Sequence, residues 1–316
     1  LLVLHLRTCV FLTSFWQGSA CFVLFLLVGN LTLLGNHGSH TVFIKSDGSL
    51  WGMGNNDNGE LGLGDTTDRT TPVQIVSAGV MSVVTGSNHT AFLKGDGSLW
   101  AMGDNANGQL GDGTEDIDRT IPVQIVSSGV ISVSAGGQYT TFIKSNGSLW
   151  AMGRNNEYQL GLGNKTQRNT PVQVVSSSVV SVSGGLYHTM FIKSDGSLWG
   201  TGHNANGELG VGDTSNRLSP VQVISSDVIS VSAGSYHTTF SKADGSLWAT
   251  GFNNSGQLSL GDTTSRATPE QVVAGVAVEG PVVVFDDDQY YLGGVVAEKL
   301  ARDGHAVTLV TPGGET

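Results

Sequence analysis

KSDGSLWGMG, residues 45–54, joins a tight-turn sequence to an aromatic segment, and it is the first of five similar copies in the chain. The others are KGDGSLWAMG at 94–103, KSNGSLWAMG at 144–153, KSDGSLWGTG at 193–202 and KADGSLWATG at 242–251. Asp-Gly and Asn-Gly favour the positive φ angles of a type I′ hairpin turn. We therefore expect a hairpin turn in each copy, leading into a strand whose Trp side chain wedges between adjacent sheets.

The tryptophans of these copies define a structural period. They are Trp51, Trp100, Trp150, Trp199 and Trp248, separated by 49, 50, 49 and 49 residues. A second series keeps nearly the same spacing: Pro72, Pro122, Pro171, Pro220 and Pro269. Repeats of this length are typical of propellers and solenoids, in which each unit buries its apolar face against its neighbours.

Each repeat contains four short strand-like segments. In the third repeat they are VISVSAG (130–136), YTTFIK (139–144), GSLWAM (147–152) and PVQVV (171–175). Their β-branched and aromatic residues favour strands, and no helical period connects them. Four strands per unit and radial repetition predict an all-β fold, a β-propeller of four-stranded blades over residues 30–275.

The repeat pattern GxxHTxFxKxDGSLWxxGxNxxGxLGxGDxxxRxxPVQVV resembles that of the regulator of chromosome condensation repeat family, including its bacterial members. The resemblance covers about residues 31–273, although a glycine of the pattern is lost at Glu157–Tyr158 and another at Ser259. It implies seven blades, of which only five are visible here. We therefore expect an incomplete or open array, whose unpaired sheet edges invite self-association.

The GxxHT turns of the repeats supply the candidate binding residues. The resemblance implies that these turns lie on one rim, where variable residues perform nucleotide exchange on a nuclear GTPase or inhibition of a β-lactamase in relatives. Tyrosine offers much contact area to a protein partner at low entropic cost. The predicted protein-binding rim consists of Asn88, His89, Gln138, Tyr139, Tyr187, His188, Tyr236 and His237. The alternative is that the imidazole and hydroxyl groups merely satisfy backbone groups in the turns.

Composition argues against several functions. The net charge of −11 and the absence of a Lys/Arg cluster oppose nucleic-acid binding. The loops rich in Asn, Asp and Gly lack the acidic spacing of calcium loops, so we expect no metal site. The in-phase arginines (Arg69, Arg119, Arg168, Arg217 and Arg266) lie near Asp65, Asp68, Asp118, Asp213 and Asp262, which predicts ion pairs within the loops rather than a basic binding ring.

The N-terminal segment, residues 1–29, is strongly apolar. Residues 10–36 contain no Asp, Glu, Lys or Arg, and Arg7 precedes them. This pattern predicts a signal peptide or a membrane anchor, and hence a secreted or cell-envelope protein. The alternatives are a buried segment or a mistranslated upstream stretch.

The C-terminal segment, residues 276–316, departs from the repeat pattern. It predicts a Rossmann-like βαβ fragment, with strands at 282–285 and 306–310 and a helix at 292–302. About 35 residues resemble the C-terminal region of trimethylamine-dehydrogenase-like flavin oxidoreductases, but the flavin-bearing barrel and the cysteine-ligated cluster of those enzymes are missing. Asp286, Asp287 and Asp288 stand where glycines would bind a pyrophosphate, so we expect no bound cofactor.

The favoured function is a non-catalytic repeat scaffold that binds another protein. No arrangement of nucleophile, base and orienting residue clusters in the sequence. Two alternatives remain: a fragment of, or fusion to, a flavin- or nicotinamide-dependent oxidoreductase, and guanine nucleotide exchange by family analogy.

Overall fold

The computed structural model describes residues 32–33, 38–273, 282–285 and 307–310. Twenty strands form five antiparallel four-stranded sheets, or blades. Blade 1 contains β1 (Thr32–Leu33), β2 (His40–Ile44), β3 (Leu50–Gly54) and β4 (Arg69–Val76). Blade 2 contains β5 (Val80–Thr85), β6 (His89–Lys94), β7 (Leu99–Gly103) and β8 (Arg119–Val126). Blade 3 contains β9 (Val130–Ala135), β10 (Tyr139–Lys144), β11 (Leu149–Gly153) and β12 (Arg168–Val175). Blade 4 contains β13 (Val179–Gly184), β14 (His188–Lys193), β15 (Leu198–Gly202) and β16 (Arg217–Ile224). Blade 5 contains β17 (Val228–Ala233), β18 (His237–Lys242), β19 (Leu247–Gly251) and β20 (Arg266–Val273).

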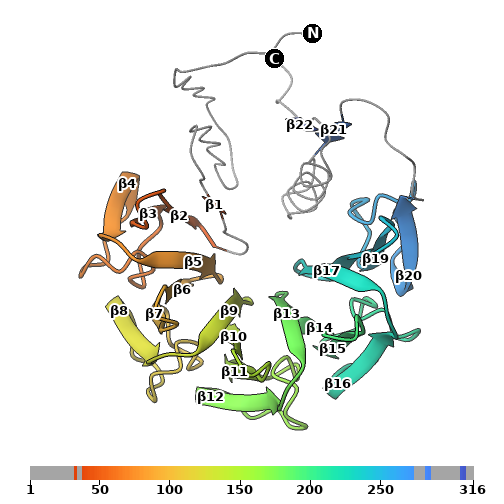
Figure 1. Ribbon diagram of the computed structural model, residues 1–316, viewed down its shortest axis with the longest axis horizontal. Helices are drawn as coiled ribbons and strands as arrows, with labels where there is room; N and C mark the ends of the chain where they lie inside the picture. The colour runs from red at the N-terminus through yellow and green to blue at the C-terminus, as the bar shows by residue number, and fades with distance from the viewer. Residues whose placement is uncertain (1–31, 34–37, 274–281, 286–306, 311–316) are drawn as a thin grey trace.

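The blades follow one another around an open arc (Figure 1). The first strand of each complete blade lies toward the centre and the fourth lies at the outside. Neighbouring inner strands pack together, β5 on β9, β9 on β13 and β13 on β17. Blades 1 and 5 stand at the two ends of the arc. The predicted incomplete propeller of four-stranded blades is therefore confirmed.

The hairpin turn of each repeat differs from the predicted type I′ turn. In the first repeat, the N–H of Gly48 donates to the carbonyl of Lys45 at 2.9 Å, so Ser46 and Asp47 are the central residues. Among these residues only Gly48 has a positive φ, +77°. A type I′ turn needs two positive φ angles, whereas a three-residue hairpin loop ends with one left-handed glycine. The prediction of type I′ was wrong, because Asp47 does not adopt a positive φ angle. Its carboxylate instead stabilises the turn by accepting hydrogen bonds from Ser49.

A chain of side-chain hydrogen bonds explains why DGSLW is repeated. The carboxylate of Asp47 accepts from the N–H of Ser49 at 2.9 Å and from its hydroxyl at 2.5 Å. The indole N–H of Trp51 then donates to the Ser49 hydroxyl at 2.8 Å. The ammonium group of Lys45 lies 3.4 Å from the centre of the same indole ring. The turn therefore orients the tryptophan, and every copy of the motif needs all of these residue types.

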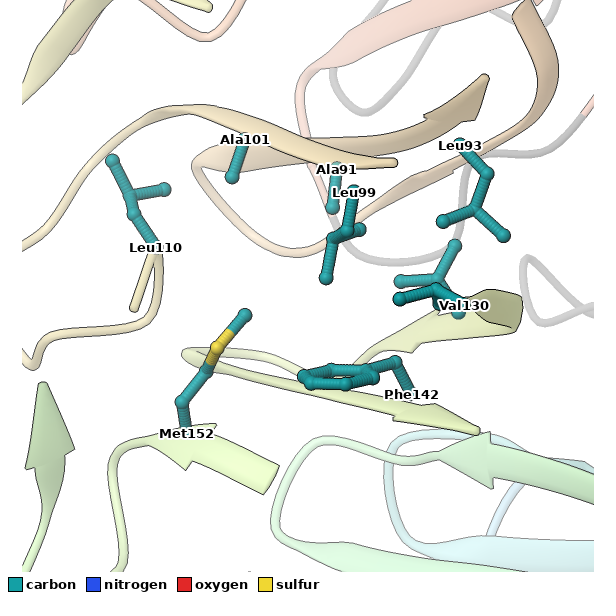
Figure 2. Close-up of a cluster of buried hydrophobic side chains, with 9 residues drawn as sticks. Ala91, Leu93, Leu99, Ala101, Leu110, Val130, Phe142 and Met152 are labelled. Carbon is teal, nitrogen blue, oxygen red and sulfur yellow. The ribbon is translucent and has the colours of Figure 1, made fainter. Parts of the chain in front are cut away.

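The apolar core lies between successive blades. Between blades 2 and 3, Leu93, Leu99 and Leu110 meet Phe142 and Met152, all fully or nearly fully buried (Figure 2). The half-buried Trp150 of blade 3 packs against this cluster and stacks on Phe142, with ring centroids 6.3 Å apart. Because each core is shared, no blade buries its apolar residues alone. The prediction that the tryptophan packs between sheets is confirmed.

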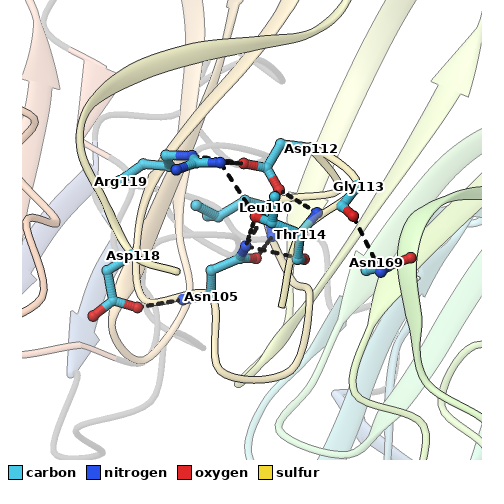
Figure 3. A network of polar contacts seen from close by, with 8 residues as sticks. All are labelled: Asn105, Leu110, Asp112, Gly113, Thr114, Asp118, Arg119 and Asn169. Atoms are coloured by element: carbon cyan, nitrogen blue, oxygen red, sulfur yellow. Dashed lines mark hydrogen bonds and ion pairs between the residues drawn. The ribbon is translucent and has the colours of Figure 1, made fainter. Parts of the chain in front are cut away.

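One buried asparagine organises the long loop between the third and fourth strands. In blade 2 the side-chain oxygen of Asn105 accepts from the N–H of Leu110 at 3.1 Å (Figure 3). Its amide nitrogen donates to the carbonyl and the hydroxyl of Thr114 at 3.2 and 3.0 Å. Its own backbone N–H donates to Asp118 at 2.9 Å. Equivalent asparagines, all fully buried, occupy the other loops: Asn56, Asn155, Asn204 and Asn253.

Replacing Gly97 with valine is expected to lower the free energy of unfolding by about 1 to 3 kcal/mol. Gly97 has a φ of +77°, and an added Cβ would lie 2.8 Å from the backbone nitrogen of Gly129, in the turn that leads into the next blade. The matched control is Gly245→Val, because Gly245 has a φ of +85° but no atom within 4 Å of its added Cβ. Urea unfolding should show the larger loss for Gly97→Val. An unchanged midpoint in that variant would contradict the turn assignment.

The C-terminal segment contributes two described strands, β21 (Val282–Phe285) and β22 (Val307–Val310). They pair in parallel, with Val282 opposite Val307 and Phe285 opposite Val310. The predicted helix at 292–302 lies outside the described residues, as does the predicted signal peptide or anchor at 1–29. In the part of the chain that the structure describes, no helix is long and apolar enough to cross a membrane.

Candidate binding rim

The GxxH turns of successive blades lie side by side along the arc. The N–H of Ser87 donates to the carbonyl of Gly137 in the next blade at 2.9 Å, and the N–H of Gly137 donates to Gly185 at 3.3 Å. Within a blade, the residue after the third strand bonds to the turn, as Asp104 N–H does to the carbonyl of Asn88 at 2.8 Å. We call these turns and the residues that follow the third strands the rim.

The histidines of the rim turns are buried, and His40, His89 and His188 link neighbouring blades. The Nε2 atom of His89 lies 2.9 Å from the hydroxyl of Thr140, which donates to the carbonyl of Gln109 at 2.9 Å. His40 and His188 make the same contact with Thr90 and Thr238. His89 and His188 are fully buried, and His237 is 5% exposed. Because a partner cannot reach these side chains, the prediction that His89, His188 and His237 belong to a contact surface was wrong.

Tyr139 is also unavailable to a partner. It occupies the histidine position of the third repeat and is fully buried. Its hydroxyl donates to the carbonyl of His188 and accepts from the hydroxyl of Thr189, the latter at 3.0 Å. Burial raises the pKa of the Tyr139 hydroxyl far above its ordinary value. Its inclusion in the predicted contact surface was therefore wrong, and it joins blades 3 and 4 instead.

The other four predicted residues remain accessible. Asn88 is exposed, and Gln138, Tyr187 and Tyr236 are half-buried. The rings of Tyr187 and Tyr236 have centroids 6.1 Å apart. The rings of His203 and Phe252, both half-buried, extend this group: His203 lies 6.3 Å from Tyr187, and Phe252 lies 6.4 Å from Tyr236. We call Tyr187, His203, Tyr236 and Phe252 the aromatic row.

A guanidinium group lies at one end of the aromatic row. The central carbon of the Arg154 guanidinium is 5.3 Å from the centre of the Tyr187 ring. Its Nη1 atom donates to the side-chain oxygen of Gln138 at 2.5 Å. Sequence reasoning missed Arg154, His203 and Phe252. The sequence contains a feature that could have identified them: the position after the third-strand glycine varies from repeat to repeat, as the turn residues do.

His203 carries a buried counter-ion. Its Nδ1 atom lies 2.5 Å from Oε1 of Glu208, a fully buried carboxylate. The hydrogen bond that His203 donates to Glu208 raises the pKa of His203, aided by the negative charges of Glu208 and Glu157 and opposed by burial. Burial alone would raise the pKa of Glu208, but its hydrogen bond from His203 and nearby positive charge lower it. Both directions favour an ionised pair.

The in-phase arginines stay within their own loops. Arg69, Arg217 and Arg266 pair with Asp65, Asp213 and Asp262 at 2.7 Å, as predicted. Arg119 instead pairs with Asp112 at 2.5 Å, because Asp118 accepts the backbone N–H of Asn105. Asp68 likewise accepts the N–H of Asn56 at 2.8 Å. No group of three or more His, Cys, Asp or Glu residues within the described ranges is placed to hold a metal ion.

Comparisons with known proteins agree with this architecture. A family model described as the RCC1-like domain matches residues 29–285. The structure of human WBSCR16 aligns with a TM-score of 0.68 at 21% identity, covering 77% of this chain and 68% of that one. Yeast RCC1 (Prp20), in a structure with bound Kap60, aligns with a TM-score of 0.66 at 20% identity, covering 75% of this chain. The present chain spans 60% of the length of that Prp20 chain.

A second structure of Prp20p, from Saccharomyces cerevisiae, aligns with the same TM-score of 0.66 at 19% identity, covering 75% of this chain and 62% of that one. Its description reports binding properties toward Gsp1p and histones. At these identities the likeness shows a shared propeller fold. No curated protein sequence matches the chain.

Proposed function

The chain belongs to the family of RCC1-like domains, and from this premise we propose that it is a non-catalytic scaffold whose rim binds another protein. A propeller of this family is a repeat scaffold, and different functions on one fold depend on surface residues. Prp20, a structural relative, is described as binding Gsp1p and histones. Binding of a protein partner is therefore the function class that the fold best supports.

The observation that carries the proposal is the aromatic row. Tyr187, His203, Tyr236 and Phe252 come from two blades and form contiguous ring contacts while staying partly exposed. Tyrosines and other aromatic side chains are enriched at protein interfaces because they bury much area with little loss of entropy. The equivalent turn and post-strand positions in blade 2 hold Asn88 and Asp104, so the row gives one part of the rim a distinct surface.

Replacing Tyr187 or Tyr236 with alanine is expected to weaken binding of a rim ligand by about tenfold or more. The ligand is obtained by selecting a displayed library of random linear peptides on the full chain. Affinities of a selected, labelled peptide are then measured by fluorescence polarisation. Tyr158→Ala is the matched control, because Tyr158 is half-buried in a loop of blade 3 and contacts Lys165 instead of the aromatic row.

The control variant is expected to bind as the wild type does. Failure to select any peptide whose binding depends on Tyr187 or Tyr236 would overturn the proposal. Guanine nucleotide exchange stays a prediction from the family resemblance alone, and no feature of the described rim favours it over simple binding.

A further inference from the structure

We propose that the rim recognises an acidic segment of its partner, with one carboxylate bound by Arg154 while neighbouring residues of the segment pack on Tyr187 and Tyr236. This inference rests on the proposed function and specifies the chemistry of the partner. It goes beyond aromatic contact, because it assigns a charge preference to the rim of a chain whose own net charge is −11.

Arg154 differs from the in-phase arginines in its partners. Four of those arginines have a carboxylate within 2.7 Å, and Arg168 uses its N–H groups on two carbonyls and on Asn164. Arg154 makes no ion pair with any described residue, and its one described hydrogen-bond acceptor is the neutral amide of Gln138. Its Nε atom is buried without an acceptor among the described residues. The guanidinium therefore has donors in excess of its acceptors.

Contacts with Tyr187 and Gln138 orient the Arg154 guanidinium before any ligand binds. The Tyr187 ring lies against one side at 5.3 Å, and Gln138 holds Nη1. A guanidinium that is already oriented loses less entropy when it binds a ligand, and its planar fork matches the two oxygens of a carboxylate. The polar residues at the equivalent position in blades 1 and 2 are engaged differently: Asn55 donates to Asp57, and Asp104 accepts from the N–H of Ala106.

The charges around Arg154 favour a single carboxylate over a larger anion. The charge of His203 is already paired with Glu208, so Arg154, at the end of the aromatic row, is the cation here that has no counter-ion among the described residues. Glu157 lies near His203 and accepts a hydrogen bond from Asn216 at 2.8 Å. A phosphate group or a nucleic-acid backbone normally needs several cations, whereas this part of the rim offers one unpaired cation and has the negative charge of Glu157 near His203.

The test uses peptides selected from the random library on the full chain. We expect Asp or Glu to be enriched beside aromatic or aliphatic residues in the selected peptides. For a selected peptide, Arg154→Gln is expected to reduce affinity by about tenfold or more, and Arg154→Lys by less. Arg168→Gln, the matched control, removes the same charge from the start of β12 in the same blade and is expected to leave affinity unchanged.

A double-mutant cycle identifies the contact directly. If Arg154 binds the carboxylate, replacing the acidic peptide residue with its amide weakens binding to the wild type but has little further effect on Arg154→Gln. Peptides that depend on Tyr187 and Tyr236 but show no acidic enrichment and no coupling to Arg154 would overturn this inference and leave the proposed function standing. Selection of no rim-dependent peptide would overturn both.

Discussion

Replacing Asn105 with alanine is expected to lower the free energy of unfolding by about 3 to 4 kcal/mol. The fully buried Asn105 side chain accepts from Leu110 N–H and donates to the carbonyl and hydroxyl of Thr114. Alanine removes these bonds and leaves a buried backbone N–H without its acceptor, which costs more than the loss of an exposed hydrogen bond. Urea unfolding followed by tryptophan fluorescence measures the loss.

The matched control is Asn107→Ala. Asn107 lies in the same loop and is half-buried; its backbone N–H donates to Gln109 at 2.8 Å, and its side chain makes no hydrogen bond to any described residue. We expect that variant to unfold within about 0.5 kcal/mol of the wild type. Equal losses in the two variants would show that the loop depends on its backbone alone and that Asn105 does not organise it.

Acidification is expected to remove about 3 kcal/mol of stability through His40 alone. Burial lowers the pKa of His40 from 6.5 to about 4, and its Nε2 atom lies 2.9 Å from the hydroxyl of Thr90 in the next blade. Because the folded-state pKa lies below the unfolded one, the unfolded chain takes up the proton first. The contribution of His40 to stability is thus constant above pH 6.5 and falls as the pH decreases toward about 4.

The test compares the wild type with His40→Gln by urea unfolding at several pH values across this interval. Glutamine does not titrate and offers an amide to Thr90. We expect the variant to lose markedly less stability than the wild type between these two pH values, whatever its stability at neutral pH. Identical pH dependence in both proteins would show that His40 does not carry the effect.

The repeat architecture was predictable because it depends on spacing. The period of the tryptophans and the β-branched segments of the third repeat predicted the blades and their four strands, which are confirmed as β9 to β12 in blade 3. The turn type was not predictable from Asp-Gly alone. The same dipeptide suits both hairpin loops, and the carboxylate of Asp47, which caps Ser49, decides between them.

The rim was predicted only in part. Tyr139 lies 50 residues after His89 and 49 before His188, so the spacing shows that it replaces the histidine of the repeat. The structure shows that this position is buried. Tyr187 and Tyr236 precede that position by one residue, which places them at the surface. Arg154, His203 and Phe252 come from a different segment of the repeat, and only the backbone pairing of that segment with the turns shows that the two sets are neighbours.

The relay from histidine to threonine to carbonyl has a consequence for how new specificities arise. In blades 1, 2 and 4 it ties the turn to the next blade through buried side chains, such as those of His89 and Thr140. The side chains of the adjacent turn residue and of the residue after the third strand take no part in this relay. Blades 2 to 5 already hold different pairs there: Asn88 with Asp104, Gln138 with Arg154, Tyr187 with His203, and Tyr236 with Phe252. Two substitutions in one blade can therefore change the side chains that the rim presents without altering the relay that holds its turns.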